Sequence, residues 1–339
     1  MRNKSLVALL VAAIPAGAGI AISALPGLRL PLAALACYAA CLIFLAGICL
    51  RVLRWASIPV PFCIPTTCGQ QKSLAWIQPA PLDNPSNGWA AAARMAGEVL
   101  FFRSLFRNTR CEVTNSRTIF SESCWLWMAA IAFHWALLLI VLRHLRLFVE
   151  PVPAPVLFLE QIDASFQVGI PRVCISDIVF CAGLLFLLWR RLADPVVRYI
   201  SQISDYLPLW LFTGIAATGL LMRHWSCVDV AAVKQFALGL ATFSPVLPQS
   251  AGALFFVHLL LVCALVAYIP SSKLMHMAGV WLSPTRNLAN NSRAVRHVNP
   301  WNHPVKTHAY AEWEAEYRDK LTDAGIPLEE TDVETTHSN

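Results

Sequence analysis

Six long apolar stretches constrain this chain more than any other feature of its sequence. Each reaches or approaches the roughly 20 residues that a helix needs to cross a bilayer. They are continuously apolar rather than alternating, which favours membrane helices over a barrel. Only 14% of the residues are charged, against about 25% in soluble domains, so apolar surface must face lipid. The stretches run from Leu6 to Ala24, Leu32 to Val52, Trp125 to Phe148, Val173 to Trp189, Leu207 to Met222 and Ala251 to Ile269.

The distribution of lysine and arginine predicts the orientation. With both termini in the cytoplasm, 20 of the 26 basic residues lie on the inner side and 6 on the outer side, as the positive-inside rule requires. We therefore predict a multi-pass protein of the cytoplasmic (inner) membrane with both termini cytoplasmic. The net charge of +6 follows from this distribution, so we predict contact with lipid and no binding of nucleic acid. The start of the chain also fits a secretory signal peptide, although no Ala-x-Ala site follows it.

The stretches divide the chain into four parts. We predict two membrane helices in residues 1–54, a cytoplasmic loop in 55–122, a bundle of the last four membrane helices in 123–276 and a cytoplasmic tail in 277–339. Within the loop, helical periodicity from Trp89 to Arg107 predicts a basic amphipathic helix, for the membrane interface or for a neighbouring subunit. Its apolar positions are Met95, Val99, Phe102 and Phe106, and its charged positions are Arg94, Glu98, Arg103 and Arg107.

The tail contains a second short helix that we expect to need a partner. Gly325 and Pro327 stand where a helix is expected to stop. A lone helix of this length is not stable in water, so we predict that it docks on another subunit. Its aromatic stripe consists of Tyr310, Trp313, Tyr317 and Leu321.

Four histidines are the candidate cofactor ligands. His134 and His144 lie in the third apolar stretch, His258 in the sixth, and His276 beyond the Pro270 break. Ionisable residues inside a membrane span are costly and are functional candidates by default. Neutral imidazole is a common axial ligand of haem iron, and helix bundles build such sites in their cores. A hydrogen bond between helices is the simpler role of any single one of them.

The spacing of these histidines predicts two sites at different depths. Ten residues separate the first two, a rise of about 15 Å, whereas eighteen separate the last two, about 27 Å in a straight helix. Because the two helices run in opposite directions, His134 pairs with His276 near the cytoplasm and His144 with His258 near the outside. The unequal rises require tilt or a kink at Pro270. We predict two b-type haems, with His224 as an alternative ligand.

The predicted fold class is therefore an all-α integral membrane protein with six transmembrane helices, the last four forming a dihaem-binding bundle. Arg143, Arg146 and Arg223 lie at the outer level, where guanidinium groups could pair with haem propionates or simply reach the interface. An iron–sulfur cluster or zinc is a weaker possibility, because C-x4-C spacing is not a strong metal signature. The cysteines concerned are Cys63, Cys68, Cys111 and Cys124.

Iron held by two histidines has no open coordination position, which favours electron transfer over substrate chemistry at the metal. A proton-coupled secondary transporter is one alternative, but it predicts matched internal repeats, and we find none. A haem-free membrane anchor is the other alternative, and it leaves the membrane histidines without a role.

The sequence also resembles known families. The histidine spacings resemble those of the dihaem gamma subunit of respiratory nitrate reductase, from Trp125 to His276. Other motifs resemble the DsrM family, the membrane cytochrome b subunits of DsrMKJOP complexes of dissimilatory sulfur metabolism, and this likeness covers almost the whole chain. These motifs are Cys63–Lys72 (CIPTTCGQQK), Pro81–Pro85 (PLDNP), Phe102–Asn108 (FRSLFRN) and Asn299–His308 (NPWNHPVKTH) with the Trp-Glu-x-Glu helix after it.

The resemblance implies particular partners and ligands. It implies an iron–sulfur subunit of the DsrK type on the cytoplasmic side, other subunits of the complex, and menaquinone as the membrane reactant. It also implies that the four histidines are axial ligands and that quinone reacts near the outer haem. Electrons could flow in either direction. The loop from Leu147 to Gly169 has no lysine, so a lysine-assisted quinone site is not supported there; the candidate substitutes are Gln161, Asp163, Lys234 and His224.

Overall fold

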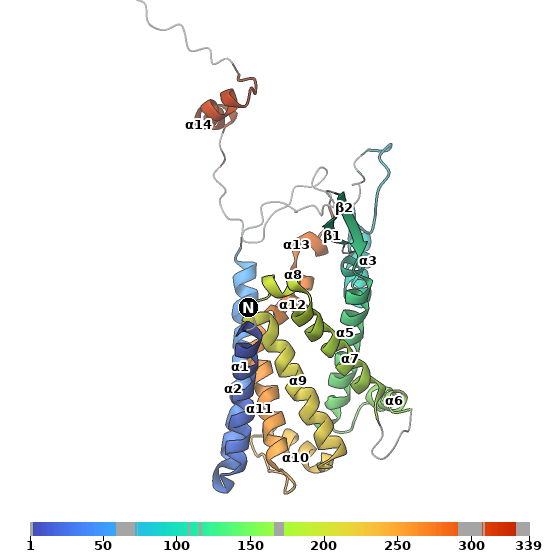
Figure 1. Ribbon diagram of the computed structural model, residues 1–339, viewed down its shortest axis with the longest axis vertical. Helices are drawn as coiled ribbons and strands as arrows, with labels where there is room; N and C mark the ends of the chain where they lie inside the picture. The colour runs from blue at the N-terminus through green and yellow to red at the C-terminus, as the bar shows by residue number, and fades with distance from the viewer. Residues whose placement is uncertain are drawn as a thin grey trace, which may run out of the picture.

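Six long helices stand side by side in the part of the chain that the computed structural model describes (Figure 1). They are α1 Asn3–Ser23, α2 Arg29–Ala56, α5 Cys124–His144, α7 Ile175–Ala193, α9 Ile203–His224 and α11 Ala253–Tyr268. The described residues are 3–58, 72, 74–107, 109–114, 117–165, 173–290, 307 and 309–329.

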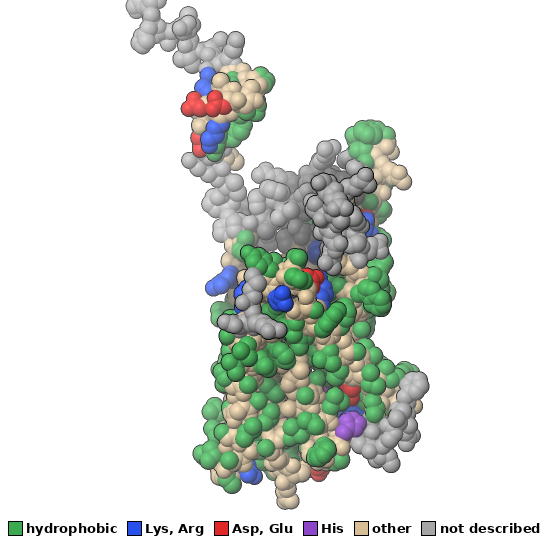
Figure 2. Space-filling view, in the orientation of Figure 1, with side chains coloured by type: hydrophobic (Ala, Val, Ile, Leu, Met, Phe, Trp, Pro, Cys, Tyr) green, Lys and Arg blue, Asp and Glu red, His purple; other side chains and the backbone are tan. Residues whose placement is uncertain are grey.

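Five helical spans among these residues are long and apolar enough to cross a membrane: Lys4–Ser23, Pro26–Ala56, Cys124–Leu147, Ile203–His224 and Ala253–Ser271. Apolar side chains cover much of the bundle's visible sides in Figure 2, and lysines and arginines gather toward its upper end. The chain is therefore an integral membrane protein, as predicted. The sixth long helix, α7, is not among these five spans, because it carries charged residues near its ends: Asp177, Arg190 and Arg191.

The first two helices pack directly on the last long one. α11 contacts α1, α2 and α9, whereas α5 packs mainly on α7. Gly19 permits the approach of α1, because a Cβ atom there would lie 2.6 Å from the backbone of Val257. Ala12 of α1 belongs to the same buried cluster as Phe133 and Phe212. Residues 1–54, predicted as a unit of their own, thus share a core with the later helices.

Short elements complete the described chain. The predicted loop also contains an antiparallel hairpin of β1 and β2, which the sequence analysis did not anticipate, although its sequence is rich in β-branched residues. The elements are η1 Pro26–Leu28, α3 Gly88–Phe101, α4 Arg103–Phe106, β1 Thr109–Thr114, β2 Arg117–Glu122, η2 Leu145–Leu147, α6 Ala154–Asp163, α8 Pro195–Ile200, α10 Val230–Ala241, η3 Ile269–Ser271, η4 Lys273–Met275, α12 His276–Leu282, α13 Pro284–Asn287 and α14 Tyr310–Asp323.

The predicted amphipathic helix forms, but it is interrupted, and two of its charged residues, Arg94 and Glu98, are buried together with Met95. Phe102 adopts a left-handed conformation (φ 50°) between α3 and α4. Glu98 is buried, because its carboxylate accepts hydrogen bonds from the backbone N and the Oγ of Ser104 and pairs with Arg286 at 3.1 Å. The expected polar face thus packs inward, while Trp89 is 89% exposed.

The predicted tail helix is confirmed as α14. Its rings stack along one side, with Trp313 5.7 Å from Tyr310 and 5.8 Å from Tyr317 between centroids. Gly325 takes a positive φ of 67°, and the N–H of Ile326 bonds to the carbonyl of Leu321 at 3.0 Å. This is the glycine-ended helix stop that the sequence predicts.

Candidate functional site

His134 occupies the middle of α5 with its ring held on two sides. Its Nδ1 donates to the backbone carbonyl of Ala130 at 2.7 Å. The rings of Phe102 and Phe133 meet it edge-on, with centroids 5.0 and 5.1 Å away. The left-handed break at Phe102 therefore brings a ring of the loop segment onto a candidate ligand.

His276 lies beside His134, as predicted. Their ring centroids are 6.0 Å apart and the rings are nearly perpendicular. The chain reaches this position because α11 ends at Tyr268, Pro270 begins a tight turn, and Ser272 is extended (φ −104°, ψ 177°). The chain from His258 to His276 is therefore not one straight helix, the case for which a rise of about 27 Å was expected.

His144 and His258 form the second candidate pair, and each has its Nδ1 within hydrogen-bonding distance of an oxygen. The Nδ1 of His144 donates to the carbonyl of Ile140 at 2.7 Å. The Nδ1 of His258 lies 2.9 Å from Oγ1 of Thr218. That hydroxyl donates its single proton to the carbonyl of Gly214 at 2.7 Å, so it accepts from His258.

All four imidazoles are thereby held in the same tautomer. The Nδ1 of His276 donates to the carbonyl of Lys273 at 2.9 Å, so three Nδ1 atoms face a carbonyl, which can only accept, and the fourth faces a hydroxyl whose proton is directed to the carbonyl of Gly214. A neutral imidazole with a proton on Nδ1 presents a bare Nε2, the form in which histidine binds a metal. None of the four Nε2 atoms makes a hydrogen bond to a residue that the structure describes.

These residues fit a haem with two axial histidines. Two imidazoles on opposite sides of one metal have centres about 6 Å apart, since each metal–nitrogen bond is about 2 Å and the ring centre lies about 1 Å further. The 6.0 Å between His134 and His276 matches this value. Within the described residues, no group of three or more His, Cys, Asp or Glu side chains could hold a free ion, but a porphyrin needs only the two axial ligands.

A buried ionic network lies next to His144. Arg143 pairs with Asp163 at 2.5 Å and with Asp177 at 2.8 Å. Asp163 also accepts hydrogen bonds from the backbone N and the Oγ of Ser176, at 2.7 and 2.6 Å. The network joins the end of α5 to α6 and to the start of α7, and so fixes the backbone on which His144 stands.

The three arginines proposed for propionates thus have carboxylate partners within the chain. Arg146 pairs with Glu160 at 2.5 Å, and Arg223 approaches Asp177 at 3.9 Å. Arg143 is buried, whereas Arg223 is 37% exposed and only loosely paired. Their role toward propionates stays a prediction, and Arg223 has the most freedom for it.

The other sequence candidates are not brought to the two pairs by any described contact. His224 is exposed at the end of α9. Lys234 pairs with Glu150, and Asp163 is committed to the network described above. Cys63 and Cys68 lie outside the described residues.

Thr218 and Phe102 were not predicted as parts of the site. Thr218 lies forty residues before the histidine that it holds, and no spacing rule joins the two. Phe102 was assigned to an apolar helical stripe, because a left-handed phenylalanine has no sequence signature.

Comparison with known proteins identifies the family. Residues 91–298 match the family described as the nitrate reductase gamma subunit. The chain belongs to the nitrate reductase gamma subunit family. The match begins after α2, so the two N-terminal helices lie outside it, while all four candidate histidines lie within it.

Two curated relatives carry the name Hdr-like menaquinol oxidoreductase cytochrome b-like subunit. The relative from Archaeoglobus profundus is 43% identical over 267 residues, which cover 76% of this chain and 79% of the relative. The relative from Archaeoglobus fulgidus is 42% identical over 272 residues, which cover 78% of this chain and 81% of the relative. The narrower likeness to the DsrM family stays a prediction.

Proposed function

We propose that this chain is a dihaem cytochrome b subunit that transfers electrons across the cytoplasmic membrane between menaquinone and an iron–sulfur subunit of its complex. His134 and His276 would hold one b haem, and His144 and His258 the other. Bound haem iron would supply reversible one-electron chemistry at each site. The common tautomer of the four histidines is the observation that carries the proposal, because one orientation repeated in four places indicates one shared task.

The other residues of the site would position these ligands and exclude water. The backbone carbonyls and Thr218 keep a proton on each Nδ1, and Phe102 and Phe133 close around His134. A buried, hydrogen-bonded environment is what sets the potential of such a centre.

We further propose that α7 is the sixth membrane crossing. Its charged residues lie within its first and last turns, where they can reach the headgroup region. Six crossings put both termini on one side, and the count of basic residues assigns that side to the cytoplasm. The His134–His276 pair is then the inner one.

The names of the relatives support menaquinol as the membrane reactant. In that reaction a menaquinol gives up two electrons and two protons and becomes menaquinone; the electrons leave singly toward the partner. We place the quinone reaction near His144, at the outer end. A DsrK-type iron–sulfur subunit in a complex of sulfur metabolism is the partner that the sequence motifs favour, docked on α3, α13 and α14.

A reduced-minus-oxidised absorption spectrum of the purified chain, with haem counted after extraction, tests the proposal. About two non-covalent b haems per chain are expected. A folded chain that contains no haem after expression with ample haem would overturn the proposal, and a haem-free anchor would then explain it better.

A further inference from the structure

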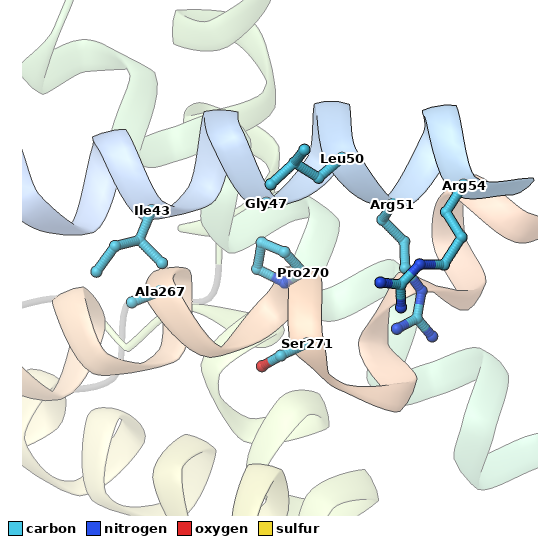
Figure 3. A pocket seen from close by; sticks show the side chains of 8 residues that line it. All are labelled: Ile43, Gly47, Leu50, Arg51, Arg54, Ala267, Pro270 and Ser271. Atoms are coloured by element: carbon cyan, nitrogen blue, oxygen red, sulfur yellow. The ribbon is translucent and has the colours of Figure 1, made fainter.

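A groove between α2 and the end of α11 carries two arginines that form no ion pair with an acidic residue in the part of the chain that the structure describes. Its volume is about 270 Å³, and its lining residues are Ile43, Gly47, Leu50, Arg51, Arg54, Ala267, Pro270 and Ser271. In Figure 3 both arginine side chains extend from α2 toward the side on which Pro270 and Ser271 lie.

No described acidic residue compensates the charge of this pair. Neither Arg51 nor Arg54 has an ion pair with any described residue, and the first 82 residues of the chain contain no aspartate or glutamate. The Nε of Arg51 is shielded from solvent and makes no hydrogen bond, although its guanidinium lies over the ring of Trp55 at 5.6 Å. Arg51 and Arg54 lie about one helical turn apart on α2, and guanidinium donors that no described residue uses attract an anion.

The depth of the groove matches that of lipid headgroups. The stretch from Leu30 to Leu50 has no charged residue and rises about 30 Å, which is the thickness of the hydrocarbon core. Arg51 and Arg54 therefore lie at the level where the headgroup region begins. Below them the groove is apolar, and Gly47 keeps it narrow, since a Cβ there would lie 2.6 Å from the ring of Pro270.

We propose that this groove binds an anionic phospholipid, with its phosphate on Arg51 and Arg54 and an acyl chain along Ile43 and Leu50. Basic pockets between membrane helices on the cytoplasmic side recognise anionic headgroups, and the apolar floor selects a lipid over a free ion. The proposal needs only that α2 and α11 cross the membrane, so it stands or falls independently of the haems.

The test counts lipids bound to the full-length chain by native mass spectrometry, after exchange into mixed micelles of phosphatidylglycerol and phosphatidylcholine. The wild-type chain is expected to retain phosphatidylglycerol. The double variant R51Q/R54Q should lose about 30-fold in affinity, since each arginine contributes about fivefold. R190Q is the matched control, because Arg190 ends a different helix, and it should retain the lipid.

Two further measurements distinguish the effect of charge from that of the groove's shape, and the binding of a lipid from that of a free anion. A267L keeps both arginines but fills the groove, and it should also reduce retention. Excess inorganic phosphate should not displace the lipid from the wild-type chain. Equal retention by wild type and R51Q/R54Q, equal retention of phosphatidylcholine, full retention by A267L, or displacement by phosphate would each overturn the proposal.

Discussion

The two histidine pairs are built differently, although all four imidazoles end in the same tautomer. The pair of His134 and His276, called the His276 end below, is held by the backbone. Two backbone carbonyls accept from the Nδ1 atoms, and a break after α11 brings the second ring to 6.0 Å from the first. The His144–His258 pair, the His144 end, depends on side chains. Thr218 holds one ring, and a buried arginine network fixes the helix end beside the other.

This contrast indicates which end single substitutions can alter. A backbone carbonyl cannot be removed by mutation, so the His276 end is changed chiefly through its ligands or through the loop that covers it. The His144 end can be changed one hydrogen bond at a time.

Removal of a ligand should abolish one site and leave the other. We expect H134A and H258A each to reduce the haem content from about two to about one per chain, because iron held by one histidine loses half of its protein ligation. Haem extraction and the reduced-minus-oxidised spectrum measure this loss. H224A is the control and should keep both haems; a loss of haem in H224A would make that residue a ligand instead.

Loss of the buried network should weaken the His144 end most. In D163N the amide cannot balance Arg143, and breaking a buried ion pair costs about 3 kcal/mol or more. Thermal unfolding of the purified chain, followed by protein and haem absorbance, should show a lower midpoint, with the haem at the His144 end released first. E160Q removes the partner of Arg146 from a more exposed ion pair, whose Arg146 and Glu160 side chains are 44% and 26% exposed, and should cost less than about 1 kcal/mol. Equal shifts in the two variants would contradict the network's role.

Removal of the Thr218 hydroxyl should alter the His258 site alone. T218V keeps the side-chain shape but takes away the acceptor for Nδ1, and loss of such a partner typically lowers metal affinity about 10–100-fold. Haem titration and redox titration of the two centres should show a change in one centre only. T213V is a close control, since Thr213 lies on the same helix and its hydroxyl also donates to a backbone carbonyl, that of Leu209. If T213V changes the same centre as much, the effect comes from α9 and not from the hydrogen bond.

Sequence reasoning found what depends on composition and on spacing along one helix. The apolar stretches predicted the long helices to within a few residues. The pairing of His134 with His276 followed from the opposite directions of the two helices, although their unequal rises required tilt or a kink. The break that makes this pairing possible was located at Pro270, but its geometry depends on the extended Ser272. Contacts between distant segments, such as Thr218 with His258, could not be predicted, because they depend on the rotation of two helices about their axes.

The burial of charged residues on α3 was not predicted for a related reason. Periodicity assumes that charged positions face water, but Glu98 finds Ser104 and Arg286 inside the fold. A charged residue can be buried when other segments supply its hydrogen-bond and ion-pair partners. A single stretch of sequence does not contain those partners.

The smallest expected effect concerns the loop that covers the His276 end. Arg103, with Arg107, donates to Asp83 and lowers the pKa of that carboxyl. Because the folded pKa lies below the unfolded value of about 3.9, the stabilisation is present above that value and is lost as pH falls through the lower, folded pKa. Hydrogen exchange of α3 and α4 should therefore be faster in D83N than in wild type at neutral pH, because the free energy of local opening falls by less than about 1 kcal/mol. The exchange rates of the two proteins should converge in acid. D229N removes the charge of the α10 N-cap but keeps an accepting side-chain oxygen, and it should leave α3 and α4 unchanged. A difference between D83N and wild type that persists in acid would show that charge pairing is not what holds this loop.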